Sequence, residues 1–104
     1  MKITNWNCDG VNNKYSKLQN LAIDTDIVCI SETKLLNTRN FFCPSNYNYI
    51  RKDRGGEHAG GGLIIMIKNN LQYKEIKVDF SIFGIEVQGI KVFKDGEYLN
   101  IFNV

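Results

Sequence analysis

The chain has 104 residues, of which 43% are hydrophobic and 23% are charged, and its formal net charge is +2. This length fits one domain or part of one, and the composition excludes an intrinsically disordered chain. A net charge this close to zero does not by itself indicate a nucleic-acid-binding protein.

The first third of the chain predicts a strand, a helix and a second strand. Residues 2–6 form a short strand, and apolar residues then recur at helical spacing over residues 13–23, with Asn12 or Asn13 as the N-cap. The run Ile27-Val28-Cys29-Ile30 is rich in β-branched residues and too short for a helix, which favours a strand buried on both faces. We therefore expect a βαβ unit with two parallel, neighbouring strands.

The rest of the chain is predicted as strands. "YNYIRKD" and "GGLIIMIKNN" are two strands with a glycine-rich hairpin connection between them. Further strands are expected at 73–78, 82–93 and 97–104, the last two joined by Asp95-Gly96, a strong hairpin signal. Because an apolar run stops at Val104 without a turn residue, we expect the chain to be truncated within a strand.

Polar side chains follow both predicted parallel strands. Asn7 and Asp9 follow the first strand, and Glu32 follows the second. Functional groups gather beyond the carboxyl ends of parallel strands, so these side chains are expected to face one crevice, where amide and carboxylate oxygens suit Mg²⁺. Simpler interpretations remain: Glu32 pairs with Lys34 or Lys52 at the surface, and Asn7 and Asp9 are turn or cap residues.

Two motifs resemble a known family. "WNCDG" and the later "ISETK" resemble the paired opening motifs of the exonuclease-endonuclease-phosphatase superfamily, which includes AP endonucleases and the endonuclease domains of non-LTR retrotransposons. "YIRKDRGGEHAGGGLIIMIKN" resembles the retrotransposon pattern of Arg-x-Asp-Arg, a polar insert, a glycine triplet and an apolar strand. The resemblance covers the whole chain and the N-terminal half of the family's domain.

This resemblance implies an α/β fold, called α+β in some schemes. Residues 1–104 would be the N-terminal portion of one four-layer α/β sandwich, with a mixed sheet and one clear helix. We expect the chain to supply the first sheet and its helix but not the second sheet. The inner faces of its strands would then expose a large apolar patch and make the chain poorly stable or oligomeric.

The resemblance also implies a function. The protein would be a Mg²⁺-dependent endonuclease, with Mn²⁺ as a substitute metal, that hydrolyses DNA phosphodiester bonds and nicks target sites in retrotransposition. Glu32 would coordinate the metal, Asn7 would orient a catalytic carboxylate, and Asp9 would support the metal region. Retrotransposon members often carry asparagine at the Asp9 position, so "WNCDG" is closer there to the AP endonucleases.

Other parts of the family's site are not found in the sequence. The Gly-Asp-x-Asn segment and the Asp-His pair are absent from the 104 residues, and we expect the isolated chain to be inactive. His58 lies in the glycine-rich loop and is interpreted as a solvent-exposed bystander. A full-length product would carry a reverse transcriptase domain in the same chain. The alternatives are a non-catalytic nucleic-acid- or partner-binding remnant, and a phosphatase or phosphodiesterase of the same superfamily.

The glycine-rich loop has two interpretations. Five of the nine glycines fall within residues 55–62, beside Arg51, Lys52 and Arg54. The loop leads into a strand and lacks Gly-Lys-Ser/Thr, which excludes a P-loop. Its glycines either permit tight backbone turns only, or they allow a DNA backbone to approach the three basic side chains.

The cysteines indicate the compartment. Their number is odd, and Cys8, Cys29 and Cys43 show no CxxC or CxxH spacing, which argues against a disulfide framework and a zinc site. We interpret them as reduced, small apolar residues in the nucleus or cytoplasm. The sequence shows no signal peptide and no apolar run of the ~18 residues that span a membrane.

Overall fold

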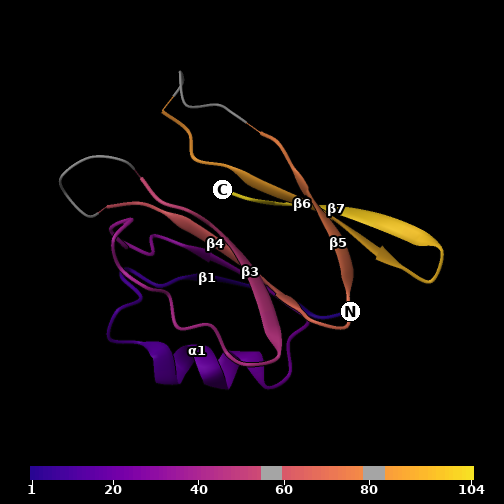
Figure 1. The fold of residues 1–104 in the computed structure, drawn as a ribbon, viewed down its shortest axis with the longest axis horizontal. Helices are drawn as coiled ribbons and strands as arrows, with labels where there is room; N and C mark the ends of the chain where they lie inside the picture. Colours follow the sequence, from indigo (N-terminus) through magenta and orange to yellow (C-terminus); the bar gives the residue numbers. More distant parts are fainter. Residues whose placement is uncertain (55–59, 79–83) are drawn as a thin grey trace.

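The structure is a computed structural model that describes residues 1–54, 60–78 and 84–104. Within these ranges the chain forms one helix and seven strands (Figure 1). In chain order they are β1 (Ile3–Asn7), α1 (Tyr15–Ala22), β2 (Ile27–Ser31), β3 (Tyr47–Lys52), β4 (Leu63–Lys68), β5 (Gln72–Ile76), β6 (Gln88–Lys94) and β7 (Glu97–Asn103).

The first sheet has the strand order β1-β2-β4-β3. β1 and β2 are parallel, with Asn7 opposite Ser31, and α1 connects them as the βαβ prediction required. β4 is antiparallel to both of its neighbours, and Lys52 of β3 lies opposite Leu63 of β4. The predicted hairpin between these two strands is therefore confirmed, although residues 55–59, including His58, lie outside the described part of the chain.

The helix is shorter than predicted, and its N-terminus differs. Neither Asn12 nor Asn13 caps it, because both residues lie in a turn that precedes the helix. In this turn the Lys14 amide donates to the Val11 carbonyl at 3.0 Å. Lys14 occupies the N-cap position without a side-chain cap, and its ammonium donates instead to the carbonyls of Cys8 and Asp9. Among the residues described here, no helix is long and apolar enough to cross a membrane.

The second sheet is antiparallel, with the order β5-β6-β7. Asp95 and Gly96 connect β6 to β7 and both have positive φ angles, +54° and +78°, as this two-residue turn demands. Of the strand predicted over 82–93, residues 82 and 83 lie outside the described part of the chain. Residues 84–87 were wrongly predicted, since they are not in a strand and β6 begins at Gln88. Gly84 has a positive φ of +69°, which an extended strand does not accommodate.

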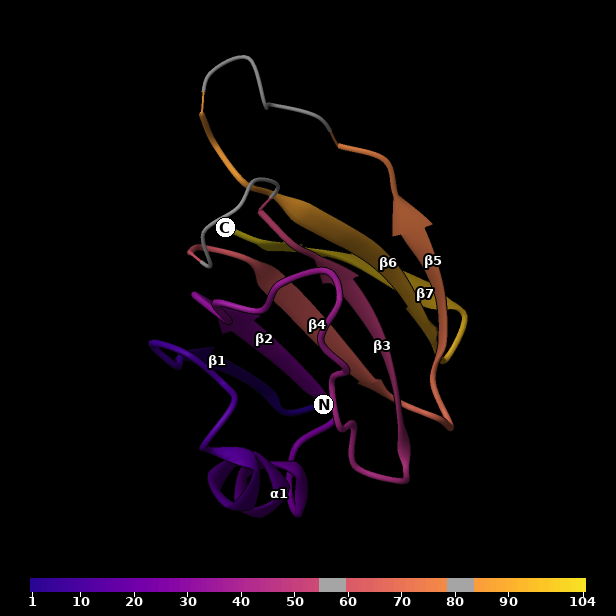
Figure 2. The same ribbon diagram turned by 60° about the vertical axis from the view of Figure 1, so that its left-hand side comes forward.

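The two sheets pack face to face, so the predicted exposure of the strands' inner faces was wrong. Figures 1 and 2 show α1 on one side of the first sheet and the second sheet on the other. The apolar core between the sheets buries Ile27, Cys29, Ile65, Ile67, Ile90, Val92 and Ile101. Sequence order alone did not separate the two sheets, because β5 follows β4 after a short turn and could have extended the same sheet.

Two buried side-chain amides, those of Gln88 and Asn103, form hydrogen bonds between the sheets. The side-chain nitrogen of Asn103 donates to the Ile30 carbonyl at 2.9 Å and to the Ile64 carbonyl at 3.2 Å. It also lies 3.2 Å from the side-chain oxygen of Gln88, whose nitrogen donates to the Ile50 carbonyl at 2.9 Å. Because buried polar groups are costly without partners, these bonds fix the position of the second sheet on the first.

Candidate functional site

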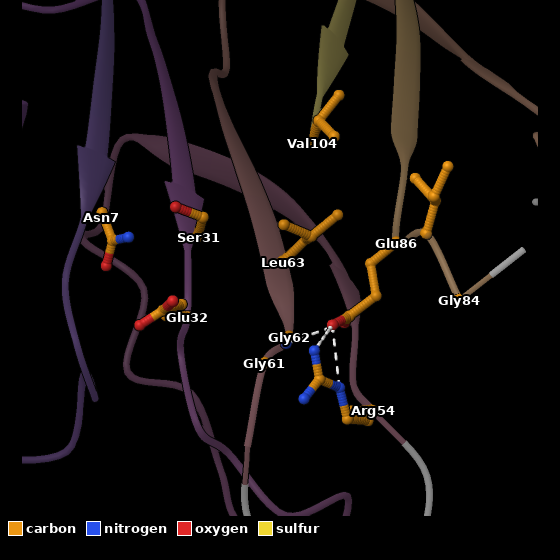
Figure 3. A pocket seen from close by; sticks show the side chains of 11 residues that line it. Asn7, Ser31, Glu32, Arg54, Gly61, Gly62, Leu63, Gly84, Glu86 and Val104 are labelled. Carbon is orange, nitrogen blue, oxygen red and sulfur yellow. Dashed lines mark hydrogen bonds and ion pairs between the residues drawn. The ribbon is translucent and has the colours of Figure 1, made fainter. Parts of the chain in front are cut away.

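A cavity of about 370 Å³ lies where both sheets end. It is bordered by the carboxyl ends of β1 and β2, the start of β4, the segment before β6 and the end of β7 (Figure 3). The residues that line it are Asn7, Ser31, Glu32, Arg54, Gly61, Gly62, Leu63, Gly84, Ile85, Glu86 and Val104.

Asn7 and Glu32 meet at this cavity. Parallel pairing places Asn7 opposite Ser31, so the residue after β2 lies beside the end of β1. Figure 3 shows both side chains on the same side of the cavity. Both residues therefore lie together at the ends of the parallel strands, as predicted, while their catalytic and metal-binding roles stay predictions.

The backbone of Glu32 is in an unusual conformation. Its φ is +53°, in the left-handed region that costs a residue with a side chain about 1–2 kcal/mol. Hydrogen bonds hold it there: the Glu32 carbonyl accepts from the Gly10 amide at 2.8 Å, and the Thr33 amide donates to the Gly62 carbonyl at 3.2 Å. Strain of this kind is concentrated at functional positions in proteins.

The simpler interpretation of Glu32 as half of a surface ion pair is not supported. Lys34 forms its ion pair with Asp9. The Lys52 ammonium donates to the carbonyls of Val78 and Val87, at 3.4 and 3.2 Å. In the described ranges, Glu32 forms no ion pair, and its carboxylate is exposed at the cavity.

Asp9 is placed differently from Asn7 and Glu32. It does not line the cavity, and the hydrogen bond from Lys34 lowers the pKa of its carboxyl group. Its backbone amide donates to the side-chain oxygen of Asn7 at 3.3 Å. This is an Asx-type turn contact, and a turn is the simpler role predicted for both residues. Their turn role is therefore observed, and the contribution of Asp9 to a metal site stays a prediction.

The cysteines offer no ligand at this site. The Cys8 thiol is buried and donates to the Ser31 and Glu32 carbonyls, and burial raises its pKa. Burial also raises the pKa of the Cys29 and Cys43 thiols to about 11. All three cysteines are free, as predicted.

The three basic residues proposed to contact DNA make internal contacts. Arg51 pairs with Asp53 at 2.9 Å and donates to the carbonyls of Leu36 and Arg39. Lys52 is engaged as described above, and only Arg54 lines the cavity. These hydrogen bonds give Arg51 and Lys52 a structural role, and DNA contact by any of the three stays a prediction.

Two residues near the cavity were missed by the sequence analysis. Glu86 accepts from the Gly62 amide at 2.8 Å and from Nε of Arg54 at 3.0 Å, although it was predicted to lie within a strand. Nothing in its sequence neighbourhood indicated these partners. Asn103 did carry a signal, because it is a polar residue in an apolar run and shares a strand face with the buried Ile101.

Two packed sheets, one helix and polar side chains at the ends of two parallel strands make up the predicted mixed α/β fold. No family model and no curated protein sequence matches the chain. Solved structures do match, and two of them are described here. One is the 3′-5′ exonuclease NExo from Neisseria meningitidis, with a TM-score of 0.60. The other is the 3′ phosphatase NExo from Neisseria bound to a product DNA hairpin, with a TM-score of 0.62.

The likeness covers most of this chain but less than half of those proteins. Each comparison shows 21% sequence identity and covers 96% of this chain and 40% of the solved one. The fold class predicted from the two opening motifs is thereby confirmed. The chain spans 40% of the length of the proteins that share its fold.

Proposed function

We propose that the cavity is the metal-binding part of a hydrolase that acts on DNA phosphodiester bonds. The observation that carries this proposal is the placement of Glu32. Its backbone is strained, its carboxylate is exposed at the cavity, and it lies beside Asn7 at the ends of two parallel strands. The fold shared with a protein named as a 3′-5′ exonuclease supports a nuclease over an unrelated hydrolase.

The donor set fits Mg²⁺, with Mn²⁺ as its substitute. Both cations prefer oxygen ligands, and Mg²⁺ is usually held by one or two carboxylates while it keeps several waters. Glu32 supplies a carboxylate, and the cavity is large enough for waters. The side-chain oxygen of Asn7 already accepts from the Asp9 amide. Among the described residues, no group of three or more His, Cys, Asp or Glu side chains is placed to hold a metal ion, so Glu32 would be the one carboxylate that this proposal assigns to the cation.

In this proposal Glu32 holds the cation and Asn7 orients neighbouring polar groups. When bound, the cation would stabilise negative charge that develops on the phosphate and lower the pKa of a bound water. The finer assignment, target-site nicking in retrotransposition, rests on the Arg-x-Asp-Arg and glycine-triplet pattern. The activity of the whole protein also requires a base, which the family resemblance assigns to segments not found in these 104 residues.

Metal binding tests the proposal directly. Titration of the chain with Mn²⁺, followed by electron paramagnetic resonance of the free ion, should show one site. Because Glu32→Gln keeps the shape of the side chain but removes its charge, it should weaken binding by at least about tenfold. The matched control is Glu75→Gln, which removes an exposed carboxylate from β5 outside this cavity. Equal Mn²⁺ affinity in the chain and in Glu32→Gln would overturn the proposal.

A phosphatase is the second candidate, because one of the two similar structures is named a 3′ phosphatase. Supercoiled plasmid and a DNA hairpin with a 3′-phosphate distinguish internal cleavage from removal of a terminal phosphate. We expect neither reaction from the 104-residue chain in Mg²⁺, since no base is assigned within it. DNA binding that is unaffected by Glu32→Ala but weakened by Arg54→Gln would indicate a non-catalytic binding module instead.

A further inference from the structure

The carboxylate of Glu86 connects the two sheets at the edge of the cavity. Glu86 precedes β6 of the second sheet, whereas its donors, Arg54 and the Gly62 amide, follow β3 and precede β4 of the first. Its side chain is only 22% exposed, and Figure 3 shows the carboxylate across the cavity from Asn7 and Glu32. Three hydrogen bonds to one carboxylate, two of them from a guanidinium, distinguish this contact from an ordinary surface ion pair.

The backbone beneath this carboxylate favours glycine. Gly61 and Gly62 have φ angles of +56° and +92°, a region that residues with side chains rarely adopt. A Cβ on Gly61 would collide with the Glu86 carboxylate and the Arg54 guanidinium, and a Cβ on Gly62 would collide with the Thr33 hydroxyl. The ion pair and the two glycines therefore form one closely packed unit.

This unit is hydrogen-bonded to the residues that follow Glu32. The Gly62 carbonyl accepts from the Thr33 amide at 3.2 Å, and the Gly61 carbonyl accepts from the Lys34 amide at 2.8 Å. One continuous set of contacts thus runs from Glu86 through Gly62 to Thr33 and the strained Glu32. The Gly10 amide holds Glu32 from the other side.

We propose that Glu86 is a positioning residue: through Gly61 and Gly62 it keeps Glu32 in the left-handed conformation that presents its carboxylate to a divalent cation. This inference rests on the proposed function for the identity of the ligand. The charge of Glu86 is neutralised by Arg54, so Glu86 acts on the cation through Glu32 and is not itself a ligand. Residues of this kind that orient a ligand typically change metal affinity by about 10–100-fold when they are removed.

The test compares Glu86→Ala with Glu86→Gln. Alanine removes every acceptor for the Gly62 amide, whereas glutamine keeps one oxygen that can accept from this amide and loses the charge and the second acceptor, which Arg54 uses. We expect Mn²⁺ affinity to fall by about tenfold in Glu86→Ala and to stay within about threefold of the parent in Glu86→Gln. The control is again Glu75→Gln, which should leave the affinity unchanged.

Amide hydrogen exchange measured by NMR without metal gives a second readout. In Glu86→Ala the amides of Thr33 and Lys34 should exchange at least about tenfold faster, because their acceptors are no longer held. The amide of Met66 in β4 should keep its protection, which shows that the variant remains folded. Arg54→Lys keeps a cation but loses the forked geometry, and it should raise exchange at the same two amides by a smaller factor.

Two results would overturn the inference. Unchanged exchange at Thr33 and Lys34 in Glu86→Ala would make the contact an ordinary surface ion pair. A loss of Mn²⁺ binding in Glu86→Gln as large as in Glu32→Gln would make Glu86 a metal ligand. If the parent chain bound no Mn²⁺, the proposed metal site would fail, and the exchange measurement would still decide whether Glu86 positions Glu32.

Discussion

Glu32 combines two properties that conflict at the level of a single residue. Its carboxylate is available for a cation, but its backbone occupies a region where a Cβ is unfavourable. Two neighbouring residues, Asp9 and Lys34, also have positive φ angles, of +48° and +53°. The segments after β1 and β2 therefore carry a local energetic cost, which the hydrogen bonds between them offset.

The backbone strain at Glu32 should lower the free energy of unfolding, whereas the carboxylate of this residue should raise the affinity for Mn²⁺. Glu32→Ala keeps the Cβ and the strain, whereas Glu32→Gly relieves it, so the glycine variant should be about 1 kcal/mol more stable than the alanine variant. Both variants should lose Mn²⁺ affinity. Urea unfolding followed by circular dichroism measures the difference, and an alanine variant as stable as the glycine variant would show that the backbone at Glu32 relaxes freely.

At the level of the elements, local patterns predicted most of the secondary structure but not how the strands divide into sheets. The β-branched run of β2 and the Asp95-Gly96 turn have their own local signals, and both were found correctly. The break between β4 and β5 had none, because strand alternation does not tell which sheet a strand joins. Asn7 and Glu32 were located because parallel pairing follows from the intervening helix, whereas Glu86 is brought to the site by packing between the sheets.

The amide bridge between β7 and the first sheet predicts a large effect of one substitution. Asn103→Ala removes the donor to the Ile30 and Ile64 carbonyls and leaves two buried acceptors without it. The free energy of unfolding should fall by about 1–3 kcal/mol, the usual cost of an unsatisfied buried polar group. The matched control is Asn100→Ala in the same strand, where the side chain is exposed and the loss should stay within about 0.5 kcal/mol. Similar losses in the two variants would contradict a structural role for the bridge.

The whole molecule has the dimensions of a compact domain. Its radius of gyration is 13.4 Å, and a folded chain of about 100 residues is expected to have roughly 13 Å. The core between the sheets accounts for this, since Ile90 and Val92 of the second sheet are buried against Ile65 and Ile67 of the first. We therefore expect the two sheets to unfold together.

A substitution in one sheet should then be detected by a probe in the other. Ile90→Ala removes a fully buried side chain from the second sheet and should reduce the free energy of unfolding by about 2–5 kcal/mol. Trp6 lies in β1 of the first sheet and packs against the core on the helix side, so its fluorescence reports on that sheet alone. A urea transition of Trp6 that does not shift in Ile90→Ala would mean that the sheets unfold independently.

The β6–β7 hairpin offers a practical route to these measurements. Asp95 and Gly96 connect β6 and β7 at the end where Lys94 pairs with Glu97, whereas the cavity lies at the other end, where Gln88 pairs with Asn103. Figure 1 shows the C-terminus at the end of the hairpin away from this turn. Glu97 beside them is exposed, and Cys8 and Cys29 are buried, whereas Cys43 is half-buried and would first be replaced by serine. A cysteine introduced at Glu97 would carry a fluorescent label or a surface tether away from the cavity, so that single molecules could be observed while cations and DNA reach the cavity without obstruction.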